Sequence, residues 1–415
     1  MVIEGKHLSK ITADVSTVAK PRMNFDYTDE QEAFRREIRE WYEENLPDGW
    51  IEGDRDLPDD EDEREQFLRE WQRKLHEGGW AAIHWPEEYG GRDASLMQQL
   101  IYQQEKARVN PPPERSEIGV DLVGPAIEGF GTEEQKERYL PKILSGEELW
   151  CIGYSEPDVG SDLASLQCKA TDEGDHFRIN GQKIWTTHAH KADWCYMFTR
   201  TDDSGPKHHG ITALIVDMDQ EGVTNERIRQ ITDEREFNQV YFDDATTPKE
   251  NVLNEVDEGW EVAMRQLSFE RISLSQSLDL ERRFDELVEF CKNETRGGTP
   301  LVEDPHVREK LAEFDTRIQA AKLTYFRNVS KQMNGDLGAE ASFGKLYDSE
   351  IAADLHRFRV NLGGPKAALW GDDSPNGAAK DSLANISIRI GGGTSDIQRN
   401  IIGERVLGLP KGDQE

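Results

Sequence analysis

The segment RIGGGTSDIQRN, residues 389–400, places three consecutive glycines directly before a stretch patterned like a helix. A glycine-rich turn that runs into a helix N-terminus presents unpaired backbone N–H groups and the positive end of the helix dipole to an anion. The turn lacks the lysine of a P-loop and does not satisfy G-x-G-x-x-G, so by itself it is a weak functional signal. Its structural interpretation, a helix start capped by Thr394 or Asp396, is compatible with a binding role.

Histidines and cysteines give little support for a metal site. His188 and His190 would share one face of a strand, and His208 and His209 are adjacent, yet no nearby Cys or Asp–Glu set completes a tetrahedral site. We therefore favour structural or solvent-facing roles for these histidines and expect no metal. The cysteines show no C-x-x-C spacing, and we expect them to be reduced and mostly buried: Cys151, Cys168, Cys195 and Cys291.

Length and charge limit the classes of function. A chain of 415 residues is too long for one compact core and is expected to form two or three domains. The formal net charge of -32 repels nucleic acids and anionic lipid surfaces, so neither is an expected partner. No apolar run approaches the roughly 18 residues that span a bilayer, and the first residues lack the apolar core of a signal peptide, which predicts a cytoplasmic protein. The acidic excess fits a halophilic host and an ordinary acidic cytosolic protein equally well, and unfolding measured against KCl separates the two.

The first third of the chain reads as helices. Segment 27–47 offers Thr28 and Gln31 as a capping box before an apolar face, and Thr132 and Gln135 form another capping box. From about residue 149 to 250 the pattern alternates and is rich in β-formers, with Asn180-Gly181 as a type I′ hairpin signal. This middle part is therefore predicted to be an antiparallel β domain.

Helical spacing returns after this β region and persists to the end of the chain. Helices of 25 or more residues favour a bundle, and residues 370–382 are predicted to form a loop inside it. The predicted fold class is α+β, with an N-terminal α-helical domain over 1–148, a middle antiparallel β domain over 149–255 and a C-terminal four-helix-bundle domain over 256–415.

Residues 154–194, YSEPDVGSDLASLQCKATDEGDHFRINGQKIWTTHAHKADW, closely resemble the signature of acyl-CoA dehydrogenases, flavoproteins that introduce an α,β double bond into acyl-CoA thioesters. The usual family pattern is T/S-E-P-x-x-G-S-D, followed by N-G-x-K-x-W/F-I/T-T and A-D-W. Segments on both sides, among them GWAAIHWPEEYGG and GGGTSDIQRNIIGERVLGLP, extend the resemblance to nearly the whole chain. The family fold, an α domain, a β domain and a four-helix α domain, agrees with the order of elements expected from periodicity.

The resemblance implies FAD as the cofactor and assigns residues to it. Ser155, Trp185 and Thr187 would lie against the flavin ring, where an aromatic wall with hydroxyl and backbone donors stabilises charge on the reduced ring. Tyr154 is a further expected cofactor contact. Ser161 matches a position that contacts substrate or cofactor. The resemblance also implies cofactor contacts at Arg296, Gly363, Gly364, Gly393, Thr394 and Asp396.

The catalytic base is expected on a helix. Many family members carry a glutamate just before the Gly-Thr pair, where this chain has Gly392. Removal of a thioester α-proton needs a carboxylate within hydrogen-bond reach. One branch of the family, including isovaleryl-CoA dehydrogenases, carries the glutamate on a helix of the third domain before an arginine, which implies Glu270, with Arg271 beside it at the substrate. The alternative for Glu270 is an ordinary exposed helix glutamate. The Gly392 amide would still polarise the thioester.

Two cofactor segments depart from the family pattern. Arg296 lies near the place of an Arg-x-x-Phe-Gly segment whose arginine reaches the FAD of a neighbouring subunit, but the Phe-Gly pair is absent. Val360 replaces the glutamine of a Gln-x-x-Gly-Gly segment, whereas Gly363 and Gly364 are kept. These departures resemble a bacterial and archaeal branch that includes dehydrogenases for steroid side chains and dicarboxylic acyl-CoAs, some of which are mixed tetramers.

The resemblance thus implies an acyl-CoA dehydrogenase of fatty acid β-oxidation or related lipid metabolism that passes electrons to an electron-transferring flavoprotein. A homotetramer, a homodimer and a mixed tetramer all fit it. Two other functions stay open: a non-catalytic or partner-dependent subunit of a mixed complex, and a flavin oxidase or monooxygenase on the same fold.

Overall fold

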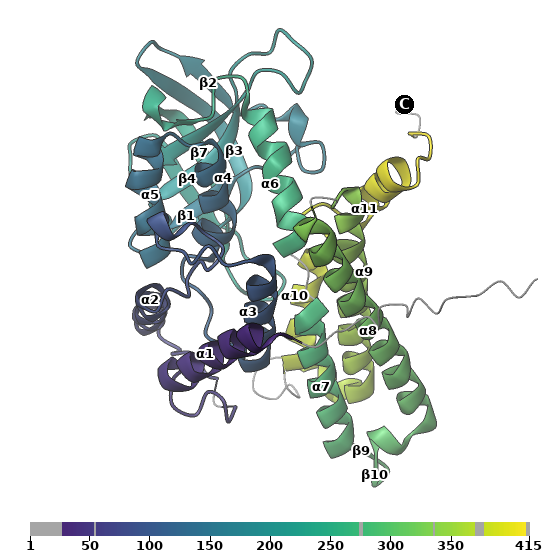
Figure 1. Ribbon diagram of the computed structural model, residues 1–415. Coiled ribbons are helices and arrows are strands. Elements are labelled where there is room, and N and C mark those ends of the chain that lie inside the picture. The colour runs from purple at the N-terminus through teal and green to yellow at the C-terminus, as the bar shows by residue number, and fades with distance from the viewer. Residues whose placement is uncertain (1–26, 54, 274–276, 335–336, 370–376, 412–415) are drawn as a thin grey trace, which may run out of the picture.

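The computed structural model describes residues 27–53, 55–273, 277–334, 337–369 and 377–411. N-terminal helices, a β-sheet and a helical bundle follow one another along the chain, and the bundle stands beside the other two (Figure 1). This order confirms the predicted α+β class, whereas the domain boundaries stay predictions. Within the described stretches, no helix is both long and apolar enough to cross a membrane.

Two helices of the N-terminal part begin at the predicted capping boxes. The hydroxyl of Thr28 accepts the N–H of Gln31, and Thr132 does the same for Gln135, each with the reciprocal glutamine bond. A π-helical turn, η2 (Gly119–Val123), leads into a short helix whose first turn contains Pro125. The α-helices of this part are α1 (Asp29–Asn45), α2 (Glu61–Glu77), α3 (Leu96–Val109), α4 (Gly124–Phe130) and α5 (Glu133–Ser145).

The middle part is an eight-stranded sheet in the order β6-β7-β3-β2-β4-β5-β8, with β1 beside β4. Most neighbours are antiparallel, as predicted, but β4 pairs in parallel with both β1 and β2. Parallel pairing needs a long connection, and the chain between β1 and β4 supplies one. The strands are β1 (Trp150–Gly153), β2 (Lys169–Asp172), β3 (His176–Thr187), β4 (Trp194–Arg200), β5 (Ile211–Asp217), β6 (Val223–Arg227), β7 (Phe237–Pro248) and β8 (Val252–Leu253).

The predicted hairpin at Asn180-Gly181 is wrong. Both residues lie inside β3, and the β2–β3 turn comes earlier, at residues 173–175. Gly181 has φ +145°, and a Cβ there would stand 2.8 Å from the Cα of Cys168. The glycine therefore serves a register shift and a close approach to the neighbouring chain instead of a turn. All four cysteines are buried and free, as predicted.

The C-terminal part contains the long helices that the sequence predicted, up to 29 residues in α8. The predicted loop over 370–382 is partly wrong, because α10 already begins at Ala378; residues 370–376 lie outside the described residues. A small hairpin, β9 (Thr295–Arg296) with β10 (Thr299–Pro300), joins two of the helices. The α-helices are α6 (Gly259–Ser273), α7 (Ser277–Asn293), α8 (Pro305–Met333), α9 (Ser342–Gly363), α10 (Ala378–Ile388) and α11 (Ser395–Ile401).

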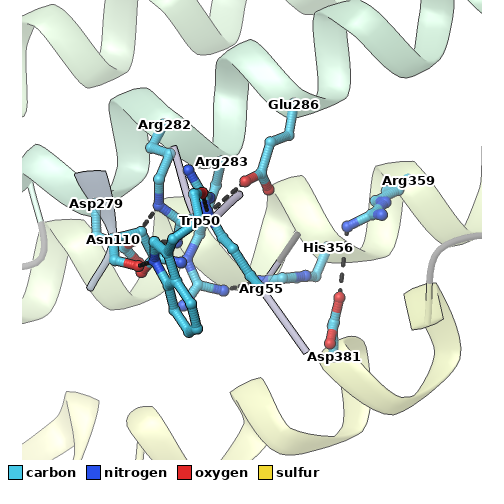
Figure 2. A network of polar contacts seen from close by, with 10 residues as sticks. All are labelled: Trp50, Arg55, Asn110, Asp279, Arg282, Arg283, Glu286, His356, Arg359 and Asp381. Carbon is cyan, nitrogen blue, oxygen red and sulfur yellow. Dashed lines mark hydrogen bonds and ion pairs between the residues drawn. The ribbon is translucent and has the colours of Figure 1, made fainter. Parts of the chain in front are cut away.

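Several contacts join the parts, among them those of α6 with β5 and α4 and of α3 with α7. The start of α6 packs closely on β5, where a Cβ at Gly259 would stand 2.6 Å from the Ala213 nitrogen. Helix α3 contacts α7. A network of polar side chains lies around α7, and Asn110, which directly follows α3, is beside it (Figure 2). There Arg283 donates to His356 Nε2 at 2.9 Å, and burial lowers the pKa of His356 to about 4. Since the buried imidazole accepts from an arginine, it is neutral and contributes a hydrogen bond, not a charge.

Candidate active site

Strand β3 carries a bulge that turns Trp185 out of the sheet. Lys183 pairs with Val240 and Thr186 with Asn238, so Ile184 and Trp185 together oppose one residue of β7. The backbone of Trp185 has φ +60°, and its side chain is 55% exposed, although it is a large aromatic residue. Bulges commonly re-aim a side chain next to a functional site. The structure thus presents an indole ring to ligands from a strand that is otherwise paired.

The bulge brings two predicted flavin-facing segments together. The Ile184 N–H, which is free of β7, donates to the carbonyl of Ser155 at 2.9 Å. Ser155 and its neighbour Tyr154 are half-buried, and the Tyr154 ring packs at 4.9 Å from that of Phe198. The predicted residues Tyr154, Ser155 and Trp185 are therefore adjacent in space although about 30 residues separate them in the chain.

A buried ion pair supports this junction from behind. Lys183 is completely buried, and its Nζ lies 2.8 Å from Glu156 Oε1 and donates to the Tyr154 carbonyl at 3.2 Å. Glu156 also accepts the backbone N–H groups of Gln167 and Cys168, at 2.7 and 2.9 Å. The sequence analysis assigned no role to Lys183 or Glu156, although both belong to the family signature. In the alternating pattern of the strand, Lys183 is at a position whose side chain faces the buried side.

The end of β3 is held by Asn238 on β7. The Asn238 amide donates to the Thr186 carbonyl at 2.9 Å, and its Oδ1 lies 3.1 Å from His190 Nδ1. Burial lowers the pKa of His190 to about 4, so the ring is neutral and belongs to this network. Thr187, the last residue of β3, is half-buried beside it, whereas Ser161 is exposed in the preceding loop.

The glycine turn has the geometry that the sequence predicted. Gly392 and Gly393 have φ +63° and +86°, a region that favours glycine. Thr394 is the cap, because its hydroxyl accepts the Ile397 N–H at 3.2 Å, whereas Asp396 pairs with Arg399. Among the described residues, nothing accepts a hydrogen bond from the amides of Gly392 and Gly393. These two N–H groups are available to a ligand.

Glu270 and Arg271 lie on α6, but their side chains are outside the described residues. The helix before them is described, and a small pocket lies between its N-terminal half and α4. Gln266 lines this pocket four residues before Glu270, so the two positions share a face of the helix. The remaining walls are mostly apolar: Leu122, Pro125, Ala126, Phe130 and Val262, with Asp121 and Arg265.

Three other predicted cofactor residues lie away from this site within one chain. Ser395, at the start of α11, donates to Glu350 of α9 at 2.8 Å. Gly363 is 13 residues farther along α9, or roughly 20 Å at the rise of a helix, and Gly364 follows it. Arg296 is in the β9–β10 hairpin at the far end of the bundle from α11 (Figure 1).

The described residues fit a flavin. An exposed indole face, the hydroxyls of Ser155 and Thr187 and the free amides of the glycine turn are the groups that bind a planar conjugated ring and stabilise negative charge on it. The buried Lys183–Glu156 pair holds the two segments that carry the indole and one hydroxyl. The indole and the two hydroxyls therefore have the chemistry that the isoalloxazine ring of FAD requires.

Comparison with known proteins places the chain in a family. Three family models match in order: the acyl-CoA dehydrogenase N-terminal domain over residues 28–147, the middle domain over 151–245 and the C-terminal domain over 257–407. The chain is 36% identical to the acyl-CoA dehydrogenase IpdE1 of Mycobacterium tuberculosis over 384 residues, covering 92% of this chain and 98% of that protein.

Solved structures show the same similarity in three dimensions. The ChsE4-ChsE5 complex from Mycobacterium tuberculosis matches with a TM-score of 0.80 and 31% identity, over 94% of this chain and 100% of that one. Butyryl-CoA dehydrogenase from Megasphaera elsdenii matches with a TM-score of 0.74 and 27% identity, over 93% and 100%. The chain therefore belongs to the acyl-CoA dehydrogenase family, whose members are FAD-dependent oxidoreductases.

Proposed function

We propose that the protein oxidises an acyl-CoA thioester between its α and β carbons, with Glu270 as the base. The observation that carries the proposal is the exposed Trp185 on its bulge, directly after Ile184, whose N–H donates to the Ser155 carbonyl. FAD, when bound, would accept the hydride from the β carbon. Trp185, Ser155, Thr187 and Tyr154 would hold its ring, and Ser161 and Asp396 would contact cofactor or substrate at the edges.

The chain's own residues would manage the proton and the carbonyl. The Gly392 N–H would donate to the thioester oxygen, where charge develops as the α-proton leaves. Gly393 and Thr394 would fix that turn at the start of α11. Glu270 would remove the α-proton, with Arg271 beside it at the substrate. Because Gly392 has no side chain, it would leave space for a base from the helix to reach the α carbon.

The test is anaerobic loss of flavin absorbance on mixing with acyl-CoAs from butyryl to palmitoyl, branched, dicarboxylic and steroidal. Glu270→Gln should bind the reactive acyl-CoA but bleach at least about 100-fold more slowly than the wild type. Glu261→Gln, which alters an exposed acid on the same helix, is the matched control and should bleach normally. Undiminished bleaching by Glu270→Gln would exclude Glu270 as the base.

A second chain would complete the cofactor site. Arg296, Gly363 and Gly364 lie away from the glycine turn of their own chain, so they would reach FAD in a neighbouring subunit. Exposed apolar side chains on the C-terminal part provide surface for such an assembly: Leu323, Met333, Ile386, Ile390 and Leu409. We propose a homotetramer or homodimer that delivers electrons to an electron-transferring flavoprotein in the cytoplasm, in fatty acid β-oxidation or related lipid metabolism.

The alternative assembly is a mixed tetramer in which this chain needs a different partner. It is favoured by the loss of the Phe-Gly pair after Arg296 and by the likeness to a solved two-protein complex. Purified protein that retains FAD and bleaches with an acyl-CoA on its own would exclude this alternative. Rapid reoxidation of the bleached protein by O2 without another acceptor would instead indicate an oxidase.

A further inference from the structure

The pocket between α4 and α6 contains a buried hydrogen-bond acceptor that the described chain leaves unused. Gln266 is only 6% exposed. Its Nε2 donates to the Leu122 carbonyl at 3.0 Å, which fixes the orientation of the amide. Its Oε1 is buried and accepts no hydrogen bond from any described residue. A buried acceptor without a donor is destabilising, so a ligand or water is expected to supply the donor.

Asp121 supplies a second acceptor to the same pocket. Its carboxylate makes no hydrogen bond or ion pair within the described part of the chain. Burial, together with repulsion from Glu114, raises the pKa of Asp121, whereas Lys106 opposes the rise. Lys106 is engaged elsewhere, since its Nζ pairs with Glu114 at 2.5 Å. Asp121 belongs to the π-helical turn η2, a form found frequently at functional sites.

The pocket therefore has an acceptor oxygen on Gln266 and another on Asp121, which keeps one acceptor oxygen even when it is protonated. Gln266 and Asp121, each with an oxygen that no described residue hydrogen-bonds, line a small space whose other walls are largely apolar, so an O–H or N–H on an otherwise apolar group is complementary to it. A carboxylate would meet both oxygens and be repelled. Arg265 also lines the pocket, but it is an exposed residue whose guanidinium lies over the Phe130 ring, 5.1 Å from the centroid.

The position of Gln266 relates this pocket to the reaction. Gln266 precedes Glu270 by four residues on α6, which is one helical turn or about 6 Å along the axis. We propose that Asp121 and Gln266 form a subsite for a hydrogen-bond donor that the thioester substrate carries within about one helical turn of its α carbon. The inference rests on the proposed function for the role of Glu270. The donor has two sources, a hydroxyl on the acyl group or the cysteamine amide of the CoA arm.

Two matched substrate pairs distinguish the sources. The first compares the acyl-CoA that bleaches the flavin fastest with counterparts that carry one hydroxyl on the γ, δ or ε carbon. The second compares the same acyl group on N-acetylcysteamine and on 2-acetoxyethanethiol, which differ only by an oxygen in place of the N–H. In one of the two pairs, we expect the kcat/KM of the wild type to be about 10- to 100-fold higher for the substrate that carries the hydrogen-bond donor. The substrate without the donor leaves the buried acceptors unpaired.

Variants show whether these two residues cause the preference. Asp121→Leu and Gln266→Met should each reduce it to less than about 3-fold, whereas Asp121→Asn, which keeps an acceptor oxygen and the shape, should reduce it less. Equilibrium binding to Glu270→Gln measures the same preference without turnover. Equal rates in both pairs, a preference unchanged in both variants, or a faster reaction with a terminal carboxylate would overturn the subsite and leave the proposed function intact. No bleaching with any thioester would overturn the proposed function as well.

Discussion

Replacing Lys183 by methionine tests whether the buried ion pair positions the flavin-facing segments. Lys183 is completely buried, and at 2.8 Å from Glu156 its attraction to the carboxylate is about 6 kcal/mol at an effective dielectric of 20. Desolvation offsets part of this, but removal of one partner leaves Glu156 buried without its countercharge. We therefore expect Lys183→Met to lower the free energy of unfolding by about 3–5 kcal/mol.

Urea unfolding followed by tryptophan fluorescence measures this change, and FAD retention on gel filtration measures its effect on the site. Lys191→Met is the matched control, because its exposed ammonium is no closer than 3.5 Å to an acid and should contribute less than about 1 kcal/mol. The double variant Lys183→Met with Glu156→Gln removes the stranded charge and should regain at least about 1 kcal/mol. If Lys183→Met unfolds like the control and keeps its FAD, the pair does not position the site.

Three further outcomes follow from the structure. Trp185→Ala should weaken FAD binding about 10-fold while shifting unfolding by less than about 0.5 kcal/mol; a stability loss with normal FAD affinity would make Trp185 structural. Gly392→Ala should destabilise by about 1–2 kcal/mol because of its φ of +63°, whereas Gly391→Ala, without a positive φ, should not, and equal urea midpoints would refute this. Burial lowers the pKa of His190 and His356 to about 4, so the unfolded chain binds more protons and the stability they give above pH 6.5 is lost as pH falls toward 4. Glutamine at both positions should flatten that decline in the urea midpoint, and an equally steep decline would contradict it.

Local patterns predicted the elements well because their causes are local. The capping boxes at Thr28 and Thr132 require only two residues three positions apart, and the glycine turn before Thr394 requires only its own positive φ angles. The prediction of a hairpin at Asn180-Gly181 was wrong because the same dipeptide also suits a register shift within a strand. The reason lies in the close approach of Cys168, the residue just before β2, which a local pattern does not contain.

The contacts of the site depend on pairs that are distant in sequence. Lys183 and Glu156 are 27 residues apart, and the strand pattern gives only that Lys183 is buried, not which acid it meets. The free acceptor of Gln266 depends in the same way on the Leu122 carbonyl, 144 residues away. The roles of Glu270, Arg271 and the FAD-binding residues remain predictions from the resemblance, since no contact in the described chain tests them.

Three consecutive residues of β3 link the buried support of the proposed cofactor site to its exposed surface. The buried Lys183 pairs with Glu156, and the Ile184 N–H donates to the Ser155 carbonyl. Trp185, with φ +60°, has an exposed side chain. Because they are adjacent in the chain, a change in the buried lysine moves the bulge, and the bulge sets the direction of the indole. A short signature therefore encodes both the exposed aromatic wall and the charge pair that holds it, and altering either one should alter FAD binding.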